Sequence, residues 1–79
     1  MTEGDGTMPL SHAPLNRALL VVSLATADPH RRARLSGLGL VPGSIVSVRQ
    51  RRPAFVVQSD ETLLALEAAV ASEVMVREA

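Results

Sequence analysis

Apolar positions along the chain fall into short alternating or continuous runs that are separated by Pro, Gly, Asp and Ser. Runs of this length between turn-forming residues are typical of the strands of a small β-rich domain. The run at 18–24 is apolar at almost every position, which predicts a strand buried on both faces. In the next run, Val46 and Val48 are two residues apart and share one face. The predicted strands are residues 18–24, 44–50, 54–58, 64–66 and 74–76.

The segment after the first of these runs has a helical pattern instead. Asp28 and Pro29 are typical of an N-cap and a first helical residue, where the missing N–H of proline costs nothing. They predict a short helix over residues 29–36. Leu35 and Leu38 are three residues apart, so both are expected to face the core.

The most informative segment joins this helix to the second predicted strand. It reads Leu-Gly-Leu-Val-Pro-Gly, at residues 38–43. Gly39 and Gly43 can adopt the positive φ that ends a helix or reverses the chain, and Pro42 fixes φ for a turn. These three residues are expected to have a structural role, because none of them can act as an acid, a base or a nucleophile.

The same string resembles the Leu-Gly-Leu-x-Pro-Gly signature of the FeoA family, and of the related SH3-like domain in iron-dependent repressors. The resemblance implies a mainly all-β fold: a small SH3-like β-barrel of about five strands, with a short helix between strands one and two. Local propensity would make residues 62–71 one helix, because Leu, Ala and Glu are strong helix formers. The resemblance instead implies a strand at 64–66, a helical turn at 67–71 and a last strand that closes the barrel edge.

The resemblance begins at about Leu10, so residues 1–9 are predicted to be a disordered tail and residues 10–79 one domain. Asn16 stands where the family usually has glycine, and asparagine is the next best residue at positive φ. The hairpin at residues 51–54 is shorter than the loop that the family often carries. Contacts made by that longer loop are therefore not expected here.

Composition excludes most catalytic chemistry. The chain has no Cys, Tyr, Trp or Lys, so thiol nucleophiles and Schiff-base lysines are absent. No Gly-x-Ser-x-Gly elbow occurs, and the Gly-rich string ends a helix, whereas a phosphate-binding loop opens one. Neither enzyme activity nor a cofactor is expected.

Charge is unevenly placed, although the formal net charge is +0. Most of the arginines lie between residues 29 and 59, a stretch without acidic residues, and acidic residues are concentrated in the last third. A two-signed surface with a single aromatic residue, Phe55, argues against nucleic-acid binding. The arginines form either a solvated face that covers apolar edges or a docking surface for an acidic partner.

Arg17, the apolar run and Ala25-Thr26-Ala27 together resemble a secretory signal. The acidic and proline-containing segment before them does not fit that interpretation, and the run is too short to span a bilayer. An intact cytoplasmic chain, without direct membrane insertion, is therefore expected.

His12, Asp28 and His30 are weak candidates for metal ligands. Two histidines and one oxygen ligand fall short of a closed structural site. Asp28 is more simply explained as a helix cap and His30 as an exposed residue of the first turn. No functional metal site is expected.

The resemblance implies a non-catalytic accessory to the FeoB ferrous-iron permease, docking on it or on its GTP-binding portion. Leu38 is assigned to the core, and the candidate contact residues are Leu40, Val41, Arg51 and Arg52. The alternative is an SH3-like regulatory module that partners an iron-dependent repressor, and a weaker third hypothesis is a nucleic-acid-binding barrel. The sequence does not indicate an oligomeric state.

Overall fold

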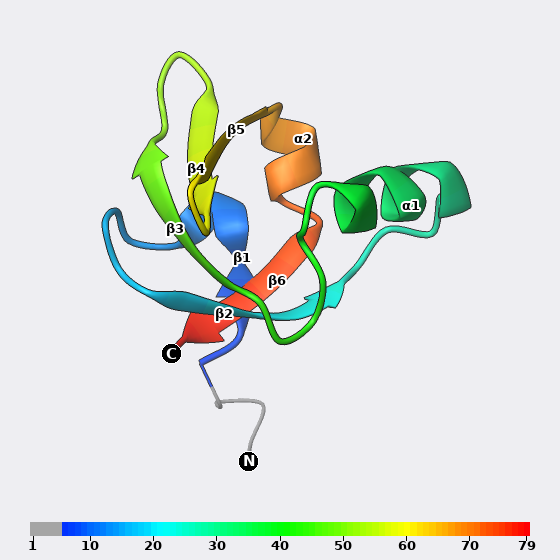
Figure 1. The fold of residues 1–79 in the computed structure, drawn as a ribbon, viewed down its shortest axis with the longest axis horizontal. Coiled ribbons are helices and arrows are strands. Elements are labelled where there is room, and N and C mark those ends of the chain that lie inside the picture. The colour runs from blue at the N-terminus through cyan, green and yellow to red at the C-terminus, as the bar shows by residue number, and fades with distance from the viewer. Residues whose placement is uncertain (1–5) are drawn as a thin grey trace.

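The computed structural model describes residues 6–79, which form one strongly curved antiparallel sheet with short helices at its ends (Figure 1). The order of strands across the sheet is β1-β6-β2-β3-β4-β5. In chain order the elements are β1 (Met8–Pro9), the 3-10 helix η2 (Leu10–His12), β2 (Leu19–Leu24), α1 (Pro29–Gly37), β3 (Ile45–Gln50), β4 (Phe55–Ser59), β5 (Thr62–Leu66), α2 (Ala68–Ala71) and β6 (Val74–Glu78).

One apolar core lies inside the curve of the sheet. Both Val46 and Val48 are buried, as their spacing predicts. In the described part of the chain, no buried side-chain nitrogen or oxygen lacks a hydrogen-bond partner. The largest fully buried side chains come from η2, four strands, α1 and the turn after it: Leu10, Leu19, Leu35, Leu40, Val21, Val46, Val48, Val57, Val74 and Val76.

Strand β2 is not buried on both faces, contrary to the prediction from its continuous apolar run. Its pairing with β6 shifts register between Val21 and Ser23, which is a β-bulge. An extra residue in one strand bends it and reverses the phase of its alternation. Leu19 and Val21 therefore face the core before the bulge and Leu24 faces it afterwards, while Val22 is 38% exposed.

The N-terminal segment is ordered closer to the chain start than the sequence suggests. Most of the predicted tail, residues 1–5, lies outside the described residues. Met8 and Pro9, however, form β1 and pair with Val76 and Met75 of β6, which gives the sheet six strands. Met8 also packs against the core. This segment is ordered because the Met8 side chain packs against the core and the backbone pairs with the edge of β6.

Residues 62–71 follow the resemblance and not their local helix propensity. β5 pairs with β4 over its whole length, from Ser59 opposite Thr62 to Phe55 opposite Leu66. The short helix α2 follows, and its Val70 is buried. A continuous helix would leave β4 without a partner on this side, so tertiary pairing overrides propensity here.

Candidate docking surface

Helix α1 begins and ends with the capping interactions that its sequence predicts. At its start, Asp28 Oδ1 accepts a hydrogen bond from the His30 N–H at 2.9 Å. At its end, Gly39 has φ +92° and its N–H donates to the Ser36 carbonyl at 3.0 Å. The Leu40 N–H donates to the Leu35 carbonyl, also at 3.0 Å. This pair of bonds is the Schellman motif.

The Schellman motif reverses the burial expected for two leucines. The motif packs the residue after the glycine against the last turn of the helix. Leu40 is therefore fully buried together with Leu35, and Leu38 is 39% exposed. The assignment of Leu38 to the core and of Leu40 to the contact surface is wrong. Val41 is 38% exposed and remains a contact candidate.

The second half of the string forms a tight turn that is fixed to strand β2. Gly43 has φ +97°, and its N–H donates to the Val21 carbonyl at 2.8 Å. The Ser44 hydroxyl accepts from the Val41 N–H at 3.1 Å and lies within hydrogen-bond distance of the Gly39 and Val41 carbonyls. These contacts hold Val41 at the outside of the turn.

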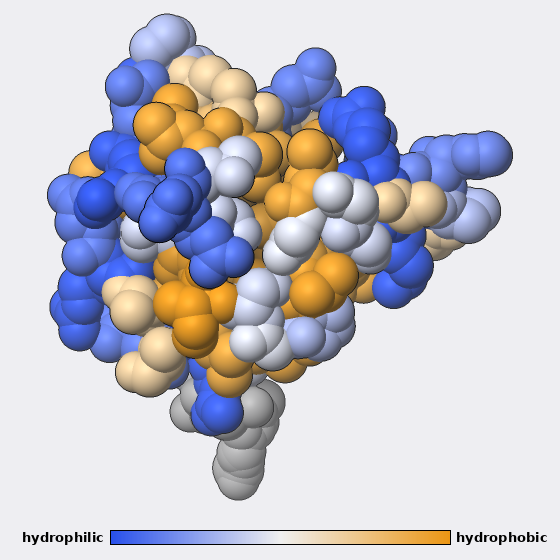
Figure 2. All heavy atoms as spheres, viewed as in Figure 1, coloured by the Kyte–Doolittle hydropathy of each residue, from blue (hydrophilic) through white to orange (hydrophobic). Residues whose placement is uncertain are grey.

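Exposed apolar side chains extend from this turn onto the sheet. Figure 2 shows hydrophobic atoms gathered in the middle of one face, with hydrophilic side chains around them. We call Leu38, Val41 and Ile45 the apolar lip, because they are all exposed within one short segment. Ile45, at the start of β3, is 48% exposed and is not among the contact residues predicted from the sequence. The large exposed hydrophobic residues of the described chain are Leu15, Val22, Leu38, Val41, Ile45 and Leu63.

Several arginines of the cationic stretch are engaged in structural contacts. Arg31 forms a 2.7 Å ion pair with Glu73, whose hydrogen bond and charge raise the pKa of the Arg31 guanidinium above its ordinary value. Arg32 donates to the Thr26 carbonyl at 2.6 Å. At the tip of the β3–β4 hairpin, Arg51 donates to the Ala13 carbonyl at 2.7 Å, so this candidate contact residue also tethers the hairpin.

The other candidate at this tip, Arg52, is exposed. No hydrogen bond or ion pair engages its side chain among residues 6–79. Its guanidinium is therefore available to a partner.

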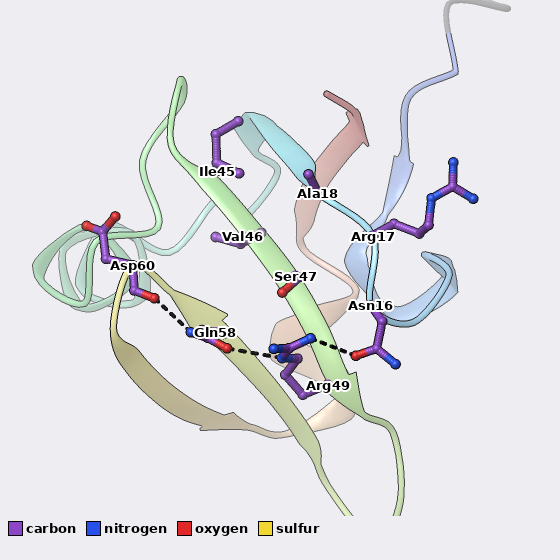
Figure 3. A pocket seen from close by; sticks show the side chains of 9 residues that line it. All are labelled: Asn16, Arg17, Ala18, Ile45, Val46, Ser47, Arg49, Gln58 and Asp60. Atoms are coloured by element: carbon purple, nitrogen blue, oxygen red, sulfur yellow. Dashed lines mark hydrogen bonds between the residues drawn. The ribbon is translucent and has the colours of Figure 1, made fainter.

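A hollow of about 330 Å³ lies beside β3 on the outer face of the sheet. Figure 3 shows a chain of hydrogen bonds across it, running from Asp60 through Gln58 and Arg49 to Asn16. Alternation along β3 places Ser47 and Arg49 on the outer face, but nothing local in the sequence indicates their partners. The hollow is lined by Asn16, Arg17, Ala18, Ile45, Val46, Ser47, Arg49, Gln58 and Asp60.

The weak metal candidates do not form a site. His12 lies in η2, whereas Asp28 and His30 lie at the start of α1, and all three are exposed. Within residues 6–79, no group of three or more His, Cys, Asp or Glu side chains is placed to hold a metal ion. In the same residues, no helix has the length and apolar character needed to cross a membrane.

Comparison with known proteins gives the family. Residues 8–78 match the FeoA domain. A solved FeoA, described as an iron uptake regulatory protein, is 25% identical, with a TM-score of 0.81 over 92% of this chain and 97% of its own. FeoA from Stenotrophomonas maltophilia, an SH3 domain protein solved with zinc, is 32% identical, with a TM-score of 0.77 over 87% of this chain and 88% of its own.

The fold extends to metal-dependent repressors. IdeR from T. acidophilum is similar over 100% of this chain and 37% of its own length, with a TM-score of 0.86 at 14% identity. That likeness concerns the fold alone. No curated protein sequence matched the chain. Because the FeoA domain match spans almost the whole described fold, the chain belongs to the FeoA family of small non-catalytic SH3-like proteins associated with ferrous iron transport.

Proposed function

We propose that this protein is a cytoplasmic accessory of ferrous-iron uptake that docks on a FeoB-type permease or on its GTP-binding portion and modulates transport. The FeoA domain match over residues 8–78 is the observation that carries the proposal. The Stenotrophomonas protein, 32% identical, is described as a candidate ferrous iron transport activating factor. A role exerted by docking fits a chain without catalytic chemistry.

The exposed part of the signature supports a docking role. The apolar lip presents Leu38, Val41 and Ile45 at 38–48% exposure on a turn that hydrogen bonds hold rigidly. A rigid apolar surface loses little entropy on binding, so its burial contributes to affinity. Arg52 at the hairpin tip adds an unpaired cation, which favours an acidic partner surface.

A regulatory role beside an iron-dependent repressor is the second candidate, because the fold matches IdeR. The match covers only 37% of that repressor, so the remainder of such an assembly would have to be another protein. Co-purification from iron-starved cells separates the two functions. Recovery of the permease supports the first, and recovery of a repressor without the permease supports the second.

Two surface variants test the docking role. We expect Val41→Asp to weaken co-purification with the permease about tenfold or more, since a charge replaces an apolar contact. We expect Arg52→Glu mainly to slow association, with an effect that shrinks as salt increases, because rim charges act on the encounter rate. Both affinity and association rate are measurable by biolayer interferometry on the purified permease.

Gly37→Ala is a matched control for these variants, because Gly37 is exposed at the end of α1 and an added Cβ meets no atom within 4 Å. It should bind like the wild type. Unchanged binding of folded Val41→Asp and Arg52→Glu would show that the docking surface lies elsewhere.

A further inference from the structure

We infer that the hollow beside β3 receives a carboxylate side chain of the docking partner, with Arg49 as the recognising group. The inference rests on the proposed function, because it assigns that carboxylate to an acidic segment of the permease's soluble portion. The hollow adjoins the apolar lip, with which it shares Ile45.

The Arg49 guanidinium is oriented without being neutralised. Its Nε donates to Gln58 Oε1 at 3.0 Å and its Nη1 donates to Asn16 Oδ1 at 2.8 Å. Both acceptors are uncharged amides. By contrast, Arg17 and Arg31 each have a carboxylate oxygen at 2.7 Å. Arg49 therefore combines a fixed position with a full charge.

The hydrogen-bond chain that orients Arg49 is anchored at both ends by unusual backbone. Gln58 Nε2 donates to the Asp60 carbonyl at 3.0 Å, which links the chain to the β4–β5 turn. Asn16 and Asp60, at its two ends, have φ of 60° and 55° and are the described non-glycine residues with positive φ. Both are turn residues, and Asn and Asp adopt this conformation more readily than other non-glycine residues, so local turn geometry fixes the two ends of the chain.

The free Nη2 of Arg49 selects the chemistry of the occupant. No hydrogen bond engages Nη2 within the described residues. Nη2 keeps both of its N–H donors and Nη1 keeps one, and adjacent donors on these two nitrogens match the two oxygens of a carboxylate. Arg17 lies at the same rim, but Glu78 pairs with its charge, so Arg49 is the lining cation without a carboxylate partner among the described residues.

The lining of the hollow fits an acidic side chain. Ser47 and Ala18, which are small, lie between the longer lining side chains in Figure 3 and leave the space open. Ile45 forms an apolar wall and is 48% exposed, so it can contact the methylene groups of an acidic side chain. Asp60 lines the hollow too, and its charge disfavours a carboxylate at that end and favours one at Arg49.

A peptide titration tests the hollow without the permease. The probe is the tripeptide Ala-Glu-Leu with blocked termini, added at millimolar concentration to the intact isotope-labelled chain. The tripeptide Ala-Gln-Leu, also with blocked termini, is the uncharged control. We expect the Arg49 Nε and Gln58 side-chain amide resonances to shift with the Glu peptide and much less with the Gln peptide. In Arg49→Gln these shifts disappear, and in Arg34→Gln, on α1, they persist. Equal shifts with both peptides, or none, overturn the inference.

A second arm uses the purified GTP-binding portion of the permease. Arg49→Gln should lower its affinity about tenfold or more, as expected for loss of a charged hydrogen bond. Arg49→Lys should recover part of this loss, because it restores the charge without the fork. If the wild-type chain binds and Arg49→Gln binds equally well, the inference fails and the docking function stands. If the wild type does not bind but the peptide shifts occur, the docking function fails and the carboxylate site stands.

Discussion

Replacing Leu40 by Asp should leave the protein largely unfolded, whereas Val41→Asp, one residue further on, should fold normally. Leu40 has 0% exposure, so the substitution removes a core side chain and buries a carboxylate without a partner. Together these effects cost more than about 5 kcal/mol. A domain this small has a stability of only about 5 kcal/mol. Val41 is 38% exposed, and its new carboxylate stays in water.

Circular dichroism and urea melts of the two variants measure this difference. Wild-type and Val41→Asp protein should show the same spectrum and a cooperative transition, and Leu40→Asp should show neither. A Leu40→Asp variant that unfolds at the same urea concentration as the wild type would contradict the buried position of Leu40. The pair also decides which variant is useful in binding assays, since only a folded variant reports on docking.

The second large effect is expected at Gly43, where valine should lower the free energy of unfolding by about 1 to 3 kcal/mol. An added Cβ would meet no atom within 4 Å, so the cost is not a clash. It comes from φ +97°, which a β-branched residue rarely adopts. Pro42→Ala should cost less, because alanine can keep the φ of proline and loses only its rigidity.

Gly37→Ala provides the matched glycine control for the Gly43 variant. Gly37 ends helix α1, and it is not among the glycines with positive φ. Alanine there should raise stability by up to about 1 kcal/mol, because it favours the helix. The two substitutions should therefore change the free energy of unfolding in opposite directions. A Gly43→Val melt that overlays the wild type would mean that this turn does not require glycine.

Elements set by local chemistry were predictable from the sequence. The Asp28 cap, the helix after it and the glycines at positive φ each depend on neighbours a few residues away. The alternation that buries Val46 and Val48 is equally local. The family resemblance correctly predicts a strand and a short helix within residues 62–71, where local propensity alone predicts one continuous helix.

The burial of Leu40 follows from the sequence, although the contact surface predicted from it includes this residue. Once Gly39 is recognised as the left-handed residue of a Schellman motif, the next residue is expected to pack on the helix. Leu35 and Leu38 are three residues apart, which predicts that they share one face of the helix. However, Leu38 is the C-cap, so its side chain does not lie on the face that Leu35 occupies. Helical periodicity therefore does not predict the burial of Leu38, which lies past the end of the helix.

Other features depend on partners far away in the sequence. β1 exists because β6 offers an edge to Met8 and Pro9. The bulge in β2 appears only in its pairing with β6. The bond between Arg49 and Asn16 joins residues that are 33 positions apart. Sequence periodicity places Arg49 on an outer face, but the acceptors that orient it belong to another strand and another turn.

Direct binding of the intact chain to the purified FeoB-type permease of the same cell is the decisive measurement of the docking role. We expect saturable binding by wild-type and Gly37→Ala protein, with a loss of about tenfold or more in Val41→Asp. All proteins should first be shown to be folded by circular dichroism. Absence of binding by the folded wild-type chain, with the permease active in GTP hydrolysis, would contradict the docking role.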